Sequence, residues 1–221
     1  MTQPAHLEQA RFNMIEQQIR PWEVLDPAVL ALLSVVKREE FVPLAHKALA
    51  FVDMELPLPG GQCMLAPKVE ARLLQELNVQ PHEKVLEIGA GSGYMAALLA
   101  HRAQRVITLE INPELARLAR TNLQQAGIRN VEVREADGAK DVAVDGPVDV
   151  ILLSGSVAEV PQPLLNQLKV GGRLAAIVGY DPVMRATIVT RGGETAFHAI
   201  QPWDTVAPRL QNFPEPSRFN F

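Results

Sequence analysis

Apolar runs of strand length alternate with segments of helical spacing from residue 85 onward. Residues 148–154 are almost continuously apolar, as expected for a central strand that is covered on both faces. Strands that alternate with helices predict an α/β domain with a mainly parallel sheet and right-handed crossovers. Residues 186–190 and 195–200 flank a Gly-Gly pair and predict an antiparallel hairpin at the sheet edge. The tail from Pro202 is expected to run across the surface.

The first sixty or so residues show helical rather than strand-like spacing. Residues 8–20 predict an amphipathic helix that Pro21 should end. Its apolar stripe consists of Phe12, Ile15 and Ile19. Asp26 and Pro27 have the side chains of an N-cap and of a first helical residue. Residues 53–62 are rich in proline and glycine and predict an irregular segment that can lie over the site as a lid or substrate loop.

Three alternate glycines interrupt the pattern directly after the apolar residues 85–88, namely Gly89, Gly91 and Gly93. A strand that leads through a glycine turn into a helix offers backbone N–H groups to a nucleotide-like ligand. The third glycine comes one residue too early for a dinucleotide loop, and the Gly-Lys-Ser/Thr of a P-loop is missing. The pattern E-x-G-x-G-x-G, which begins at Glu87, resembles the first motif of class I S-adenosylmethionine-dependent methyltransferases. A glycine turn that only packs a helix onto the sheet is the alternative.

Acidic residues end the next two predicted strands. Glu110 lies about 20 residues beyond the loop, where a carboxylate can accept hydrogen bonds from both hydroxyls of a ribose. Asp137, which precedes Gly138, could accept a hydrogen bond from an adenine amino group. The alternative for Glu110 is a solvated charge, but Asn112 and Pro113 fix the turn at once. The candidate cofactor-binding residues are Glu87, Gly89, Ala90, Gly91, Gly93, Glu110, Ile111, Asp137 and Gly138.

Several segments outside the glycine loop resemble the protein-L-isoaspartate O-methyltransferase family, in order from about residue 11 to 180. They are residues 11–20, 38–43, 61–62, 85–94, 159–162 and 171–174. The N-terminal segments matter most, because other class I methyltransferases do not share them. The resemblance implies a Rossmann-like fold whose mainly parallel seven-stranded sheet carries helices on both faces, with an N-terminal helical extension. It also implies methylation, with S-adenosyl-L-methionine, of the α-carboxyl group of isoaspartyl residues in damaged proteins.

One family motif is altered. The family usually reads Gln-Thr-Ile-Ser-Gln-Pro where residues 62–67 read Gln-Cys-Met-Leu-Ala-Pro, so Leu65 stands at the active-site serine and Ala66 at the glutamine. No catalytic residue is therefore assigned. Ser154 and Ser156, after the fourth predicted strand, are candidate donors to a substrate, and the alternative is that they only end the strand.

Three hypotheses about function stay open at this point. The first is a methyltransferase that acts on isoaspartyl or other carboxylates of a protein or peptide. The second is a methyltransferase of the same fold whose acceptor is a small molecule suited to the apolar residues Met64 and Leu65. The third is a protein that binds the adenosyl group without turnover. An NAD-dependent enzyme ranks behind these because of the glycine spacing.

Length, composition and net charge predict the domain organisation of the chain and exclude several kinds of partner. A chain of 221 residues with 48% hydrophobic content suits one compact unit, with a helical extension and lid at residues 1–78 and a cofactor-binding core at residues 79–221. A net charge of −4 argues against nucleic acid as a partner. The sequence predicts no signal peptide and no membrane span, hence a cytoplasmic protein. Five scattered histidines and Cys63 as the only cysteine predict no metal site, and the thiol is expected to be an inert apolar residue.

Overall fold

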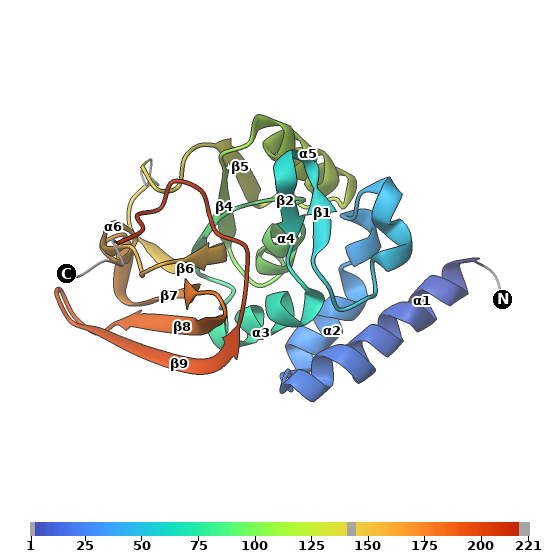
Figure 1. Ribbon diagram of the computed structural model, residues 1–221, viewed down its shortest axis with the longest axis horizontal. Helices are drawn as coiled ribbons and strands as arrows, with labels where there is room; N and C mark the ends of the chain where they lie inside the picture. The colour runs from blue at the N-terminus through green and yellow to red at the C-terminus, as the bar shows by residue number, and fades with distance from the viewer. Residues whose placement is uncertain (1–2, 141–144, 217–221) are drawn as a thin grey trace.

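A seven-stranded sheet forms the centre of the computed structural model, which describes residues 3–140 and 145–216 (Figure 1). Its strands are β3 (Lys84–Ile88), β4 (Arg105–Glu110), β5 (Val131–Glu135), β6 (Val148–Val157), β7 (Leu168–Tyr180), β8 (Val183–Arg191) and β9 (Phe197–Thr205). The strand order is β5-β4-β3-β6-β7-β8-β9, in which β3 to β7 are parallel and β8 and β9 run antiparallel to their neighbours. The predicted α/β class, the mainly parallel sheet and the edge hairpin are confirmed.

Strand β3 lies between β4 and β6, so the order of the chain reverses at this strand. Ile88 is level with Leu109 on one side and with Leu153 on the other. The glycine loop therefore lies beside Glu110, the last residue of β4, and beside Ser154, which lies in β6 just past its pairing with β3. A crevice outside the carboxyl ends of the strands at such a switch point is where open α/β sheets bind ligands.

Helices cover the two faces of the sheet unequally. Helices α3 (Pro67–Leu77), α4 (Tyr94–Ala100) and α5 (Pro113–Gln125) pack on one face. The other face is covered by the short helix α6 (Gln162–Leu165) and by Leu210 and Phe213 from the C-terminal segment. Pro67 is the first residue of α3, and the Asn112 side chain caps α5 by accepting hydrogen bonds from two backbone N–H groups.

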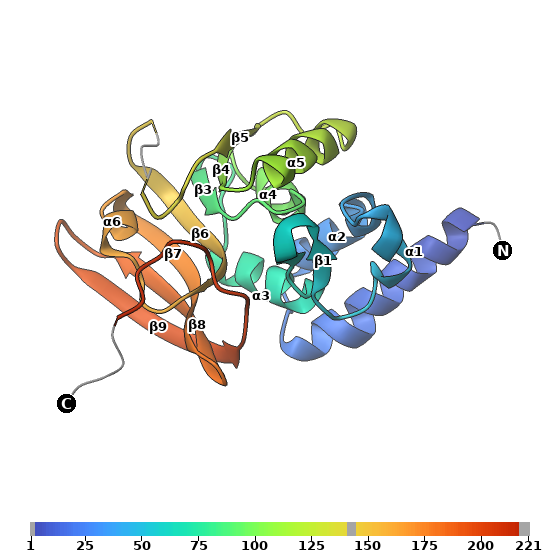
Figure 2. The same ribbon diagram turned by 45° about the horizontal axis from the view of Figure 1, so that its top comes forward.

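The N-terminal residues form helices beside the sheet, as predicted (Figure 2). Helix α1 (Gln3–Met14) continues through a π-helical turn, Ile15–Ile19, and a 3₁₀ turn, Arg20–Trp22. Pro21 does not end the helical path, because the first turn of a helix needs no N–H group from proline. Ile15 is buried, but Phe12 is 58% exposed, contrary to prediction, since the wider π turn rotates the preceding helix out of the expected register.

Helix α2 (Pro27–Val35) begins as predicted, with the Asp26 carboxylate accepting a hydrogen bond from the Ala28 N–H at 2.8 Å. Two 3₁₀ segments, Arg38–Glu40 and Leu44–Leu49, follow it. Apolar side chains of this extension share one core with the central strands. A boundary at residue 78 stays a prediction. Within the described ranges no helix combines the length and the apolar character that crossing a bilayer requires.

The segment predicted to be irregular is a β-hairpin. Strand β1 (Leu56–Leu58) pairs antiparallel with β2 (Gln62–Met64) across a turn whose Gly60 and Gly61 both have φ of +71°. Proline is tolerated in β1 because this is an edge strand, and only glycine adopts such turn angles without strain. The hairpin lies against the glycine loop, since a Cβ added at Gly91 would come within 3.3 Å of the Leu58 side chain.

Candidate active site

A pocket opens at the carboxyl ends of β3, β4, β5 and β6. Its cavity has a volume of about 60 Å³ and opens to solvent. Of the predicted residues it is lined by Gly89, Gly91, Glu110, Ile111, Asp137, Gly138 and Ser154. Residues that were not predicted to bind a ligand also line it, among them Gln62, Cys63, Leu115, Leu210, Gln211 and Phe213. The structure thus brings the ends of the glycine-loop strand and of both acid-bearing strands to one place.

The glycine loop is closed by hydrogen bonds within the protein. The N–H groups of Gly89 and Ala90 donate to the Leu109 carbonyl, and that of Gly93 donates to the Ala90 carbonyl. What Gly89 and Gly91 offer a ligand is therefore a backbone without side chains that it can approach closely. Gly93 lines no part of the pocket, and a Cβ there would meet the backbone of Ala119 at 3.3 Å, so this glycine lets α4 pack on α5.

Glu110 holds the loop in shape. Its Oε2 accepts a hydrogen bond from the Gly91 N–H at 2.9 Å, and its Oε1 accepts one from the Asn112 N–H at 3.0 Å. Each carboxylate oxygen can accept a second hydrogen bond, so both retain a lone pair for hydroxyl groups. The carboxylate is almost fully buried, yet it lines the pocket. Glu110 can thus organise the loop and bind a diol at the same time.

Asp137 faces the C-terminal segment. Its Oδ2 accepts a hydrogen bond from the Asn212 side-chain amide at 2.8 Å, and its Oδ1 accepts one from the Ala139 N–H at 3.0 Å. Burial opposes ionisation, but these hydrogen bonds and Lys140 hold the pKa of Asp137 below its usual value. The carboxylate is therefore ionised at neutral pH and can accept a hydrogen bond from a ligand amino group.

The tail does not simply run across the surface, contrary to prediction. Ser156 donates its N–H to the Pro208 carbonyl at 2.7 Å, and its carbonyl accepts the Leu210 N–H at 2.9 Å, so the tail pairs with β6 (Figure 1). Leu210 and Phe213 then form an apolar wall of the pocket. The one sequence signal for this wall is the spacing of two apolar residues in a polar tail, which is weak.

A second, smaller hollow lies beneath the glycine loop, on the side of α3 and α4. We call it the inner hollow. It is lined by Cys63, Met64, Leu65, Glu70, Gly89, Ala90, Gly91, Ser92, Tyr94, Met95 and Ser154. Because Cys63, Gly89, Gly91 and Ser154 line both, it adjoins the first pocket. Leu65 is 6% exposed and presents an apolar side chain there.

The family model of protein-L-isoaspartate(D-aspartate) O-methyltransferase matches residues 9–201. The chain belongs to this family. A relative from Koribacter versatilis (strain Ellin345), named protein-L-isoaspartate O-methyltransferase, is 40% identical over 181 residues, which cover 82% of this chain and 81% of the relative. A relative of the same name from Picosynechococcus sp. (strain ATCC 27264 / PCC 7002 / PR-6) is 44% identical over 169 residues, 76% of each chain.

Solved structures agree with this assignment at the level of the fold. A Plasmodium falciparum protein, described as a protein-L-isoaspartate O-methyltransferase in complex with S-adenosyl-L-homocysteine, superposes with a TM-score of 0.78. It is 19% identical, and the likeness covers 92% of this chain and 97% of that one. Another structure, named protein-L-isoaspartate O-methyltransferase, gives a TM-score of 0.75 at 24% identity, covering 90% of this chain and 65% of that one. The predicted family and Rossmann-like fold are confirmed.

The sequence predicts that Leu65 stands at the family's active-site serine, and the groups around Leu65 are poor substitutes for a serine hydroxyl. Ser154 donates its O–H to the Glu87 carboxylate at 2.7 Å, so its proton is already engaged. Ser156 is fully buried and lines neither hollow. Burial and the nearby Glu55 carboxylate raise the pKa of the Cys63 thiol to about 12, which leaves a neutral, weak donor.

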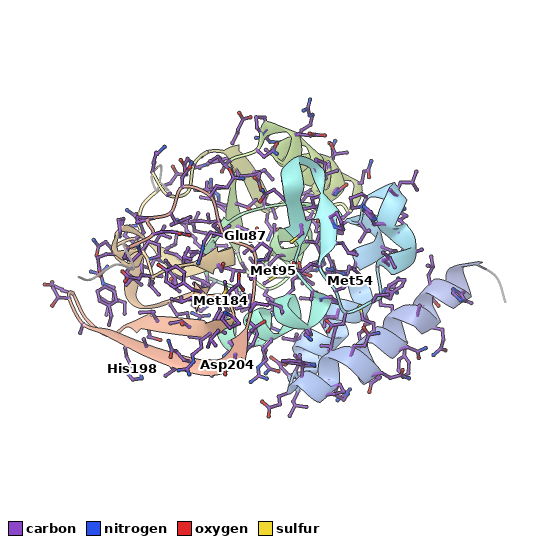
Figure 3. The ribbon with its side chains drawn as sticks, viewed as in Figure 1. Met54, Glu87, Met95, Met184, His198 and Asp204 are labelled. Carbon is purple, nitrogen blue, oxygen red and sulfur yellow. The ribbon has the colours of Figure 1, made fainter. Side chains whose placement is uncertain are left out.

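Glu87 lies under the loop near the centre of the molecule, whereas His198 and Asp204 lie on the outer strand β9 (Figure 3). Glu87 is fully buried and is not among the residues that line either hollow. Burial raises its pKa to about 7 against the hydrogen bond from Ser154. Among the described residues no group of three or more His, Cys, Asp or Glu side chains is arranged to hold a metal ion.

Glu87→Gln should change how stability depends on pH. The unfolded chain loses the Glu87 proton near pH 4.5 and the folded protein only near pH 7, so the unmodified protein loses stability as pH rises between these values. That loss amounts to about 3 kcal/mol, and glutamine removes it. Urea unfolding measures the free energy of unfolding of both proteins at about pH 5 and about pH 8. Between these values the unmodified protein should become less stable than the variant by this amount. A difference in the free energy of unfolding that stays constant over this pH range would contradict the prediction.

Proposed function

We propose that this chain uses S-adenosyl-L-methionine to methylate the α-carboxylate of isoaspartyl residues in damaged proteins, a step of protein repair. The observation that carries the proposal is the pocket into which Gly91, Glu110 and Asp137 converge from three neighbouring strand ends. Family membership supports the acceptor, because the matching relatives are named for it. A single cysteine, which rules out a disulfide framework within the chain, supports a cytoplasmic location.

The pocket fits an adenosyl ligand in three respects. Gly89 and Gly91 leave the loop without side chains, and a Cβ at Gly89 would come within 3.1 Å of Leu210. The Glu110 oxygens each retain an acceptor site for ribose hydroxyls. The ionised Asp137 and the wall of Leu210 and Phe213 suit an adenine ring with its amino group.

When bound, S-adenosylmethionine would supply a sulfonium methyl group to an acceptor oxygen by in-line displacement, with S-adenosylhomocysteine as the leaving group. A carboxylate acceptor is already nucleophilic, so this chain would need to supply no general base. The work of the protein is to position both groups and to keep water out. The β1–β2 hairpin and the C-terminal segment enclose the pocket from two sides and can do this.

A different acceptor is the second candidate. Leu65 is apolar, and burial raises the pKa of the neighbouring Glu70 to about 7 against the Arg38 guanidinium. An apolar wall with a buried acid suits an uncharged small molecule better than a second carboxylate. A protein that binds the adenosyl group without turnover is the third possibility. Methyl transfer to peptides, compared with transfer to a fraction of small molecules, distinguishes the three.

Glu110→Ala should weaken binding of S-adenosylmethionine and of S-adenosylhomocysteine by roughly 1.5–3 kcal/mol, the range for a hydrogen bond with a charged group. Titration calorimetry measures this directly. Glu135, opposite Glu110 at the end of β5 but outside the pocket, is the matched control, and Glu135→Ala should bind normally. Unchanged affinity in Glu110→Ala would refute its role. Binding of NAD, but of neither adenosyl compound, would refute the proposed cofactor.

A further inference from the structure

A fully buried arginine connects the N-terminal extension with the wall of the inner hollow. Arg38 lies in the 3₁₀ turn Arg38–Glu40 and is 0% exposed. Its Nη2 donates to the Leu65 carbonyl at 3.0 Å, its Nη1 donates to the Glu70 carboxylate at 2.5 Å, and its Nε donates to the Ala50 carbonyl at 3.1 Å. One side chain thus holds three segments that are distant in the sequence.

The same guanidinium lies over the ring of Tyr94, 5.1 Å from its centroid. Tyr94 is the first residue of α4, directly after the glycine loop, and lines the inner hollow together with Leu65 and Glu70. Arg38 therefore contacts three of the residues that line the inner hollow. It is not itself among those lining residues.

Burying an arginine and a glutamate together is seldom the most stable arrangement, since apolar side chains of similar size often serve as well or better. The specific gain from a guanidinium is its planar fork, which fixes several acceptors in one geometry. Here one acceptor is the backbone carbonyl of Leu65, which stands at the family's serine position. Leu65 and the glycine loop line the same hollow, so the position of that backbone affects the shape of the hollow.

We propose that Arg38 is a positioning residue, which holds the Leu65 segment against the glycine loop through the Leu65 carbonyl and Glu70 and so sets the acceptor side of the site. Its significance for methyl transfer rests on the proposed function. The position of the segment can be measured without any methyl acceptor. Cys63, the only cysteine of the chain, lies in β2 two residues before Leu65 and is half-buried.

The test compares two buried ion pairs in the full chain. The double variant Arg38→Met with Glu70→Leu removes the link to Leu65 without leaving an unpaired buried charge. The control, Arg11→Met with Glu39→Leu, removes a similarly buried pair of the same extension that lines neither hollow. Arg38→Lys keeps the charge but cannot reach three acceptors, and it decides the matter if the first variant does not fold.

Iodoacetamide labelling of Cys63, followed by mass spectrometry, reports how accessible the segment is. Because the Glu70 charge itself helps to raise the pKa of this thiol, the labelling rate of Arg38→Lys, which keeps Glu70, separates opening of the segment from loss of that charge. Loss of hydrogen bonds to a charged group should raise the labelling rate about ten- to a hundredfold in the Arg38/Glu70 variant, and several-fold in Arg38→Lys. The Arg11/Glu39 control should label as the unmodified protein does. The affinity for S-adenosylmethionine should stay within about twofold in all variants, while kcat/KM for the acceptor falls with the rise in labelling.

Unchanged labelling in both Arg38 variants, or an equal rise in the control, would overturn the positioning role. Unmodified protein that does not methylate isoaspartyl peptides would refute the proposed function instead, and the labelling result would still decide whether Arg38 holds the segment. If the unmodified protein does methylate the peptide, increased labelling with unchanged kcat/KM would show that the segment does not set the acceptor side. That result would also overturn the proposal.

Discussion

Leu65→Ser should raise the rate of methyl transfer to an isoaspartyl peptide about ten- to a hundredfold. An acceptor carboxylate bound next to Leu65 would lack a hydrogen-bond donor. A desolvated acceptor without its partner costs roughly 1–3 kcal/mol, which is this factor in rate if the loss falls in the transition state. The new hydroxyl supplies the donor. The nearby Ser154 cannot, because its proton already binds Glu87. Steady-state kinetics on one isoaspartyl peptide measure the effect, and Ala66→Gln can be added to restore more of the family motif.

Met64→Ser is the matched control, since Met64 is the buried neighbour of Leu65 and lines the same hollow. It loosens the packing without placing a hydroxyl at the family position, so it should not raise the rate. Turnover by the unmodified protein that equals Leu65→Ser would mean that Cys63 or a backbone N–H already binds the carboxylate. Equal gains in both serine variants would mean that space, and not the hydroxyl, limits the reaction.

Gly91→Val should weaken binding of S-adenosylmethionine by at least about a hundredfold, or about 3 kcal/mol. Gly91 has φ of +52°, which a β-branched residue adopts only with strain of roughly 1–3 kcal/mol. The added Cβ would also come within 3.3 Å of Leu58, and its methyl groups would enter the space of the ligand. Distortion of the loop would further weaken the hydrogen bond from the Gly91 N–H to Glu110. Titration calorimetry on the folded variant gives the affinity.

Gly127→Val is the control that introduces similar backbone strain at a position away from the pocket. Gly127 follows helix α5 with φ of +73°, and a Cβ there would have nothing within 4 Å. The strain should lower the free energy of unfolding of this variant by a similar amount. The variant should still bind the cofactor normally. A Gly91→Val protein that is folded and binds as tightly as Gly127→Val would show that the ligand does not approach this loop.

The features of the pocket that could be predicted are those that local sequence determines. The apolar run of β3 and the glycines after it fix a strand and a turn, and a carboxylate that follows a parallel strand must lie at the same sheet edge. The amino-acid pattern alone therefore predicts that Glu110 and Asp137 lie beside Gly91, and all three line the same pocket. Their contacts with a cofactor remain predictions.

The features that escaped prediction depend on contacts between distant segments. The apolar wall of Leu210 and Phe213 forms because the tail pairs with Ser156, and no local sequence pattern predicts such pairing. Phe12 lies outside the core because a π turn changes the helical register, which a regular period cannot show. The link from Arg38 to Leu65 spans 27 residues, and the charged run of residues 37–40 gives no sign that Arg38 is buried.

Transfer of labelled methyl groups from S-adenosylmethionine to a matched pair of peptides, one isoaspartyl and one aspartyl, shows whether this chain methylates isoaspartyl residues. We expect a base-labile methyl ester on the isoaspartyl peptide alone, formed slowly by the unmodified protein and faster by Leu65→Ser. Absence of label from both peptides with both proteins, in samples shown by calorimetry to bind the cofactor, would contradict it. The acceptor would then be a different molecule.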